Sequence, residues 1–466
     1  MANGSLNRSG LTAGGLGESC GRMLRAVCWR SSAVLLPLVF APYGAVAQTV
    51  PLSLGDAVAR AVQETAPVMM AGLRIDEAES RVREARSALL PNLSASAATL
   101  NRTMNMEAFG ISIPAAPGEE QNPLVGPFAN FDARLHFSVP VFDFAAIQRT
   151  RSAREAVAGA SAGERVAGEG AAERAALAYL RASRAEARLE AREADAALAQ
   201  ELLVLAEEQF RAGVSPAIDV TRARTQQVAA EGQVLQARNG VDLSYLELSR
   251  AMGTDPGTRF QLTRDLEGFA SGAENAAAEV LVSRALSQRP ELQQTEAERK
   301  VNEATSRAIR AERLPRVALV ADYGASGLHP SDAIATREIG VQLSVPVFDG
   351  FRREARLEAQ NSSQRITEVR DADLREQISA EVRSALLQQN SGVLQERVAR
   401  EQLALAEDEL SQARERFTNG VASNIEVINA QASLLHARDV LIEAQFVIAN
   451  ARAGLAYATG TAAELR

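Results

Sequence analysis

A six-residue segment that occurs twice constrains this chain more than any other feature of its sequence. Ser-Val-Pro-Val-Phe-Asp stands at residues 138–143 and again at residues 344–349, 206 residues later. Each copy ends a stretch in which apolar and polar residues alternate, and a period of two predicts a β-strand with one apolar and one polar face. Because proline lacks a backbone N–H, Pro140 and Pro346 suit the junction where strand pairing ends and a helix begins. We therefore expect two copies of one strand-to-helix unit.

Other landmarks repeat at nearly the same spacing. The segment Phe210–Val214 returns as Phe417–Val421, and Gly253 returns as Gly460, in both cases 207 residues later. The copies differ in length mainly between the paired strands, where a hairpin tip that points into solvent is free to vary. These coincidences predict an internal duplication.

The duplication gives the expected domain organisation. Residues 1–47 are predicted to be an N-terminal extension with a signal peptide, since arginines precede an apolar run and Ala45–Ala47 fits a small-x-small cleavage site. Met23 is then a candidate true start, and both cysteines, Cys20 and Cys28, fall in the removed part, as in an exported protein without disulfides. The remaining domains are the first repeat 48–253 with its strand hairpin 91–142 and helical hairpin 144–252, a connector 254–275, the second repeat 276–460 with its strand hairpin 315–348 and helical hairpin 351–459, and a C-terminal tail 461–466.

Prolines and glycines delimit the expected elements. Residues 144–211 hold no proline, which predicts one helix about 100 Å long at 1.5 Å per residue. Residues 101–130 and 324–336 are rich in breakers and predict loops at the tips of the strand hairpins. The other expected helices are residues 52–65 (with Ser53 as the cap), 68–90, 217–252, 276–289, 291–314, 351–418 and 424–459, and the expected strands are residues 92–100, 131–141, 259–262, 316–323 and 337–347.

The number of long strands decides what the chain is able to build. Four strands are too few for a closed barrel, and lipid leaves the N–H and C=O groups of an open edge unsatisfied. Three chains would supply twelve strands, within the range of closed outer-membrane barrels. The predicted fold class is mainly α with a β-barrel part: a duplicated strand-hairpin and long-helix-hairpin unit, assembled as a trimer with a 12-stranded outer-membrane barrel on a periplasmic α-helical barrel.

Composition argues against several other classes of protein. The net charge of −8 argues against a nucleic-acid partner, and no later stretch approaches the roughly 18 apolar residues of a membrane helix. His136, His329 and His436 are scattered, no His, Cys or carboxylate spacing suits a metal, and no glycine-rich phosphate loop follows a strand. We therefore expect a protein that is not an enzyme and that needs no metal or cofactor.

In their order, these features resemble the TolC-like outer-membrane factor family of trimeric export ducts. The resemblance covers about residues 50–460 and implies a passive outer-membrane channel of a tripartite efflux or type I secretion system, extending into the periplasm. Its carriers are the duplicated layout, the strand entries at residues 88–93 and 312–317, the repeated Ser-Val-Pro-Val-Phe-Asp, and the helix turns at residues 210–214 and 417–421.

The resemblance implies partners for the helix turns. In the family these turns face the inner membrane and contact a periplasmic adaptor, or membrane fusion protein, which links an inner-membrane pump of RND or ABC type. The alternative is that the glycines of the turns only end helices. The expected adaptor-contact residues are Gly213, Val214, Ser215, Gly420, Val421 and Ala422.

The resemblance also places a gate at this end of the molecule. Asp219 matches the family's acidic partner, but Ala422 stands where the usual arginine would be and Phe417 replaces the usual tyrosine, so closure is expected to depend more on packing. Glu426 matches an acidic ring, in which three carboxylates around a threefold axis would bind cations, and Asn429 holds a second ring position. A solvated helix face is the alternative for Glu426.

A soluble periplasmic coiled-coil adaptor is the second functional reading. Such an adaptor would also contain long helical hairpins, but it would not need four strands in which apolar and polar residues alternate. The sequence favours the outer-membrane channel, with a homotrimer, an adaptor, a pump and outer-membrane lipid as partners. It does not specify the exported cargo.

Overall fold

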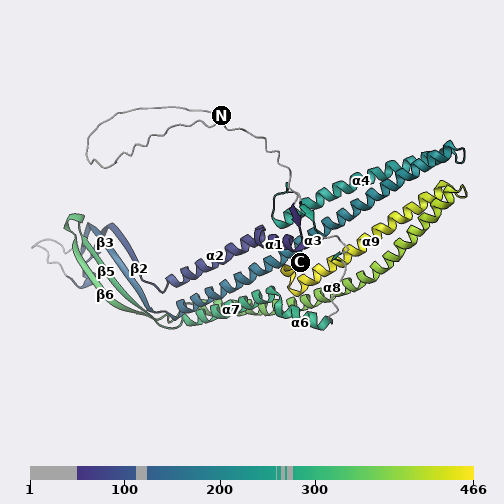
Figure 1. The fold of residues 1–466 in the computed structure, drawn as a ribbon. Coiled ribbons are helices and arrows are strands. Elements are labelled where there is room, and N and C mark those ends of the chain that lie inside the picture. Colours follow the sequence, from purple (N-terminus) through teal and green to yellow (C-terminus); the bar gives the residue numbers. More distant parts are fainter. Residues whose placement is uncertain (1–49, 112–122, 259, 264–267, 270–276, 466) are drawn as a thin grey trace, which may run out of the picture. The chain divides into compact units, whose positions relative to one another are not determined.

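The computed structural model describes residues 50–111, 123–258, 260–263, 268–269 and 277–465 (Figure 1). Several sequence predictions lie outside these residues: the signal peptide with its cleavage site, Met23 and both cysteines, the tip 112–122 of the first strand hairpin, and much of the connector. The domain boundaries inferred from the sequence remain predictions.

Eight helices are described, and the long ones match their predicted bounds closely. The predictions for α3, α4 and α9 agree residue for residue. Helix α2 begins earlier than predicted because Pro67 lies in its first turn, where a missing N–H costs no hydrogen bond. The bounds are α1 Leu54–Glu64, α2 Ala66–Ser87, α3 Phe144–Arg211, α4 Ala217–Met252, α6 Ala278–Gln288, α7 Pro290–Ala311, α8 Arg352–Thr418 and α9 Asn424–Thr459.

Side-chain caps begin some of these helices. Ser53 and Asp56 form a capping box at α1, in which the Asp56 N–H donates to Ser53 Oγ at 3.1 Å. Asp143, the last residue of the first Ser-Val-Pro-Val-Phe-Asp copy, accepts the Ala146 N–H at 2.9 Å and so begins α3. The second copy behaves differently, because Asp349 instead accepts from Arg353 Nε at 2.8 Å. The repeated segment therefore does not give repeated capping.

The four long strands form one antiparallel sheet in the order β2-β3-β5-β6. Their bounds are β2 Asn92–Asn105, β3 Leu124–Phe142, β5 Arg316–Gly327 and β6 Ile334–Ser344, and a separate short parallel pair joins β1 Val50–Leu52 to β4 Phe260–Leu262.

The prediction of a loop over residues 101–130 was wrong at both ends. Strand β2 continues to Asn105, and β3 already begins at Leu124, so Gly126 and Pro127 lie inside a strand. Arg102 of β2 pairs with Phe128, and Met104 pairs with Val125, so the register shifts between them. Gly126 and Pro127 lie at this irregularity, where regular pairing is not required. The glycines and prolines suggested a loop, but pairing between β2 and β3 determines where these strands end.

The two junction prolines also differ. Pro140 lies within β3 and is still opposite Ala318, with a register shift immediately after it. Strand β6 ends at Ser344, three residues before the predicted end, so Pro346 lies beyond the last paired residue. The pairing therefore ends before proline in one copy and after it in the other.

The register confirms one apolar and one polar face across the sheet. Leu93, Phe137, Ala321 and Ile339 lie opposite one another in a single cross-strand row. The next row points to the other face and contains Ser94, His136, Asp322 and Glu338. On this polar face His136 Nδ1 is 2.8 Å from Asp322 Oδ1.

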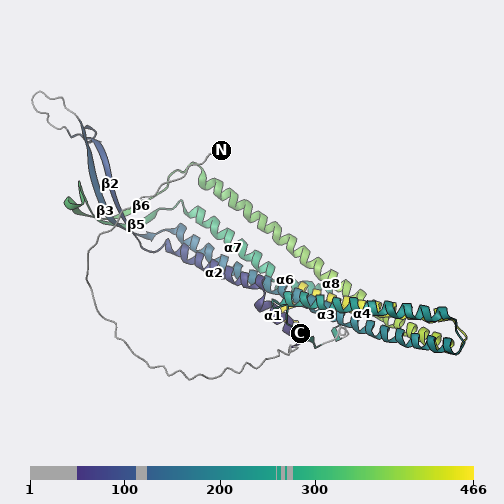
Figure 2. The same cartoon turned by 90° about the horizontal axis from the view of Figure 1, so that it is seen from above.

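The helices form two long hairpins, α3–α4 and α8–α9, with α2 and α7 beside the first half of α3 (Figure 2). The largest buried cluster gathers where α1, α3, α4 and α9 meet, and includes Leu52, Tyr179, Leu248 and Met252. The Tyr179 hydroxyl donates to the Leu52 carbonyl at 3.1 Å. Among the described residues, no helix has the length and apolar content needed to span a bilayer.

Candidate functional site

The two helix turns repeat the same backbone hydrogen bonds. In the α3–α4 turn, the N–H groups of Gly213 and Val214 donate to the carbonyls of Phe210 and Gln209 at 3.0 and 2.9 Å. The α8–α9 turn makes both bonds at positions 207 residues later, with the same distances. Gly213 and Gly420 have φ of +76° and +69°, a left-handed conformation that favours glycine. Glycine is required in both turns for this reason.

The turns lie side by side and expose apolar side chains. A Cβ on Gly420 would lie 3.6 Å from Val214 Cγ1, so one turn rests against the other. Val214 and Val421 are 62% and 71% exposed, while Ser215 and Ala422 are half-buried. We call the six residues predicted to contact the adaptor the turn surface: Gly213, Val214, Ser215, Gly420, Val421 and Ala422.

Asp219 is buried, but its carboxylate has a partner on its own helix. The nearest cation is Arg222, whose Nη1 lies 3.6 Å from Asp219 Oδ1. The connection to the other hairpin runs instead through the Asp219 backbone carbonyl, which accepts from Asn424 Nδ2 at 2.9 Å. Asn424 is buried at the start of α9 and was missed by sequence reasoning, because an asparagine at a helix start normally indicates only a cap.

Phe417 is buried in the apolar cluster between α8, α9 and α3, together with Val427 and Leu434. Its backbone carbonyl accepts from Gln209 Nε2 at 2.9 Å, across from α8 to α3. Gln209 is also buried, and nothing in its polar sequence surroundings marked it. We call the Gln209–Phe417 and Asn424–Asp219 hydrogen bonds the amide bridges, since each joins one helical hairpin to the other.

Glu426 and Asn429 are both exposed on α9. Glu426 forms an ion pair with Arg416 on the adjacent helix, with 3.2 Å between Glu426 Oε2 and Arg416 Nε. The carboxylate is 45% exposed, so both solvent and the guanidinium reach it. Its charge is thus partly compensated within the chain.

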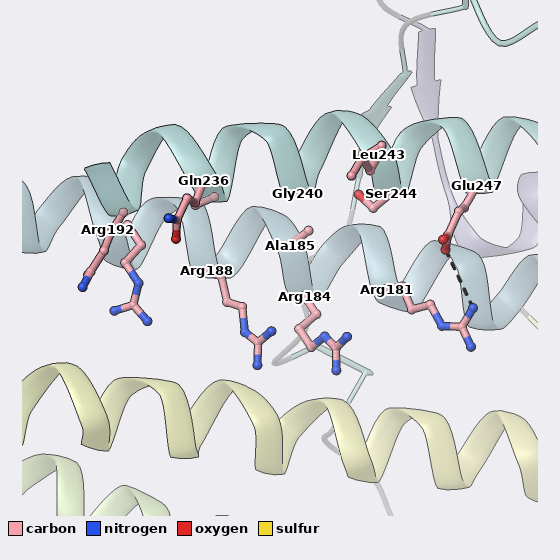
Figure 3. Close-up of a pocket in the computed structure, with 12 residues that line it drawn as sticks. Arg181, Arg184, Ala185, Arg188, Arg192, Gln236, Gly240, Leu243, Ser244 and Glu247 are labelled. Atoms are coloured by element: carbon pink, nitrogen blue, oxygen red, sulfur yellow. Dashed lines mark ion pairs between the residues drawn. The ribbon is translucent and has the colours of Figure 1, made fainter. Parts of the chain in front are cut away.

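A groove with a volume of about 710 Å³ lies along α3 and α4, away from the turns (Figure 3). Four arginines of α3 line it, and each has an acidic partner: Arg181 pairs with Glu247 across the groove, and the other three pair with acidic residues that include Glu443 and Asp439 of α9. The groove is therefore largely neutralised. No cluster of His, Cys, Asp or Glu in the described part of the chain could hold a metal ion.

Comparison with known proteins identifies the family. The sequence profile of the family "Outer membrane efflux protein" matches residues 57–254 and 281–461, most of the chain. The alkaline protease secretion protein AprF of Pseudomonas aeruginosa is 27% identical over 56% of this chain and 55% of its own length. The probable efflux pump outer membrane protein TtgC of Pseudomonas putida is 26% identical over 53% of this chain and 52% of its own. The chain thus spans about half the length of the curated relatives it matches.

Solved structures share the fold. The channel CusC has a TM-score of 0.73 at 18% identity, covering 88% of this chain and 93% of its own. The outer membrane protein VceC of Vibrio cholerae has a TM-score of 0.69 at 19% identity, covering 87% and 96%. The duplicated strand and helix hairpins, the family profile and these neighbours agree: the chain belongs to the outer membrane efflux protein family of TolC-like channels.

Proposed function

We propose that this protein is the passive outer-membrane exit duct of a tripartite efflux or type I secretion system. The observation that carries the proposal is the four-stranded sheet, which has one apolar and one polar face and is joined directly to helices about 100 Å long. A sheet of this kind suits a barrel whose outside meets lipid and whose inside is wet. Long helices attached to it suit a conduit through the periplasm.

Closure of the barrel requires sister chains. Within the described residues, β2 and β6 each pair on one side only, so both outer edges of the sheet are open. Three chains joined edge to edge would pair them all in a 12-stranded barrel. On β6, Ile339 and Val341 are 76% and 72% exposed in the single chain, as expected for side chains that contact lipid in the assembly.

The outer helices carry surface suited to the same trimer. Exposed apolar residues follow α8 and α4 at spacings made of threes and fours, the pattern of a helix that packs against another. On α8 they include Leu387, Leu394, Val398 and Leu405, and on α4 they include Ile218, Val228, Leu235 and Leu246.

The turn surface is the proposed contact with a periplasmic adaptor that links an inner-membrane pump of RND or ABC type. Its exposed valines offer an apolar centre without charge, suited to the tip of a partner hairpin. Relatives include both an efflux pump component and a protease secretion protein, and selection of cargo would lie with the pump in either case.

The gate is proposed to lie just behind this surface. The amide bridges, the buried Phe417 and the backbone of Asp219 join the two hairpins there. Glu426 and Asn429 would form two rings around the threefold axis, and Pro140 and Pro346 would mark the junction between barrel and helices. In planar bilayers, Glu426→Gln should weaken block of single-channel current by divalent cations, and unchanged block would exclude the ring.

Fractionation separates this proposal from a soluble periplasmic adaptor. The channel should remain in the Sarkosyl-insoluble outer-membrane fraction and form conducting pores after reconstitution. Recovery in the soluble periplasmic fraction would favour the adaptor.

A further inference from the structure

The two helical hairpins meet along α3 and α9, and four charged side chains bind one another across this seam. Arg192 of α3 donates to Asp439 of α9, and Arg438 of α9 donates back to Asp195 of α3 at 2.6 Å. Arg192 also reaches Asp195, at 3.2 Å, which closes the set. We call these four residues the seam network. It contains two cations and two anions and has no net charge.

The seam network is more buried than an ordinary surface ion pair. Asp195 is 1% exposed, and the Arg192 side chain is 14% exposed. A carboxylate held at this depth depends on its cations, because the protein interior solvates an isolated charge poorly. Both hairpins must therefore keep their relative position for Asp195 to remain compensated from both sides.

Apolar contacts flank the seam network toward the turns, where Leu202 of α3 packs into the α8–α9 cluster. Burial of apolar surface is favourable in many orientations and specifies position weakly. Charge-assisted hydrogen bonds from a guanidinium fork require defined directions and distances. The pairs of Arg184 and Arg188 with Glu443 cross the same interface, but that carboxylate is 44% exposed. The seam network is built on the buried Asp195 and is therefore the polar contact that constrains the register most.

The duplication does not reproduce this arrangement. At the positions 207 residues away, Arg192 corresponds to Ala399, Asp195 to Gln402 and Asp439 to Gly232. The seam network is thus specific to the contact between α3 and α9 and is not a general feature of the repeated unit.

We propose that Arg192, Asp195, Arg438 and Asp439 are positioning residues that fix the register of the two helical hairpins and thereby hold the helix turns side by side. The register itself is a property of the structure, while its consequence for conduction rests on the proposed channel function. Loss of the network would let the hairpins shift against each other and would separate the turns, although no residue of the turns had changed.

A distance measurement tests the register directly. Val214→Cys and Val421→Cys place one spin label on each exposed turn, in a background with Cys20→Ser and Cys28→Ser, so that no other thiol remains. Asp439→Asn should broaden the distance distribution between the labels and move it to longer values, and Asp439→Glu should restore the narrow one. An unchanged distribution for Asp439→Asn would overturn the inference.

Arg238→Gln is the matched control. Arg238 pairs with Glu193 at 2.9 Å, but both residues belong to the α3–α4 hairpin, so breaking this pair should leave the distance distribution unchanged.

If Asp439→Asn does not accumulate, Arg192→Lys replaces it, since lysine keeps the charge but lacks the planar guanidinium that reaches two carboxylates. Broadening supports the inference, and a distribution as narrow as that of the control contradicts it.

Single-channel recording separates this inference from the proposed function. Asp439→Asn should raise the mean current several-fold over the wild-type protein, with Arg238→Gln unchanged. A wild-type protein that never conducts would refute the channel, while the spin-label distances would still decide whether the seam network sets the register. Conducting wild type with equal current in Asp439→Asn would overturn the network's proposed effect on the gate.

Discussion

At the scale of the residue, neutral side-chain amides form the hydrogen bonds that join the two helical hairpins near their turns. Gln209 and Asn424 each donate to a backbone carbonyl of the opposite hairpin, at positions where the sequence suggested packing alone. Asp219 and Phe417, the residues singled out by resemblance, accept these two hydrogen bonds with their backbone oxygens. Any residue has a backbone carbonyl, so a comparison of side chains at matching positions does not reveal a hydrogen bond to one. The amide bridges therefore could not be predicted from the sequence.

Replacement of Asn424 should weaken the tip contact. Asn424→Ala removes the side-chain hydrogen bond to the Asp219 carbonyl in the first turn of α4, at a cost of about 0.5–1.5 kcal/mol. Planar-bilayer recordings should show more frequent opening than in the wild-type protein. Asn429→Ala, which alters an exposed residue of the same helix, is the control. Equal opening in both variants would show that the amide bridge does not hold the gate.

Glu169 of α3 provides a pH-dependent contact elsewhere in the helices. Its carboxylate accepts the Ala462 N–H at 2.8 Å and so ties the C-terminal segment to α3. Burial raises the pKa of Glu169 above its usual value, against the opposing effect of the backbone donors. A carboxyl with a raised pKa in the folded state favours folding when it is protonated, and this contribution is lost as pH rises through the folded pKa.

The Tm of the wild-type protein should therefore gain less from Glu169 at pH 7 than at pH 4. Glu169→Gln keeps an acceptor oxygen and removes the titration, so its Tm relative to wild type should rise as pH increases over that range. Thermal melts at several pH values in detergent measure this. Glu201→Gln, at an exposed position of the same helix, should follow the wild-type profile, and parallel profiles for all three proteins would contradict the assignment.

At the scale of the element, helices were predicted more accurately than strands. A helix makes its hydrogen bonds within its own segment, so the absence of proline from residues 144–211 was sufficient to predict α3. Strand ends depend on a partner strand, and β2 and β3 extended each other through a stretch rich in glycine and proline. The two copies of Ser-Val-Pro-Val-Phe-Asp illustrate the same limit, since only Asp143 caps a helix. The sites missed at the tips depend likewise on contacts between distant segments.

The helix turns should be sensitive to loss of their glycines. Gly213→Ala forces a side chain into the left-handed region, at a cost of about 1–2 kcal/mol. Amide hydrogen exchange should become faster over residues 209–216 while the rest of α3 and α4 is unchanged. Gly240→Ala is the control, because Gly240 lies inside α4 with open space around its Cβ position, and alanine should slow exchange there. Unchanged exchange at the turn would contradict the requirement for glycine.

At the scale of the whole molecule, the described part of the chain leaves sheet edges and apolar helix surface uncovered. Both outer edges of the described sheet are open, and α8 exposes Leu394, Val398 and Leu405 along one side. In the proposed trimer both features are satisfied at once, which is why the assembly and the barrel are parts of a single proposal. The sequence predicted four long strands, each with one apolar face. The structure was needed to show that two of them form the open margins of one sheet and that α8 carries exposed apolar residues.

A charge within this apolar stripe should dissociate the trimer. Leu405→Glu places a carboxylate at a position that is 63% exposed in the single chain and apolar in character, so burial against a sister chain would be unfavourable. Crosslinking of detergent-solubilised protein should yield fewer trimers than in wild type. Ala404→Glu adds the same charge one residue away, among the charged residues Arg397, Glu401 and Asp408, and should leave the trimer intact. Equal trimer yields would place the subunit contact elsewhere.

The mass of the protein solubilised from outer membranes in detergent, measured by light scattering with the detergent contribution subtracted, tests the central claim most directly. A duct completed by sister chains predicts a particle with three times the mass of the mature chain, extracted only with detergent. A monomer that stays in solution without detergent would contradict it.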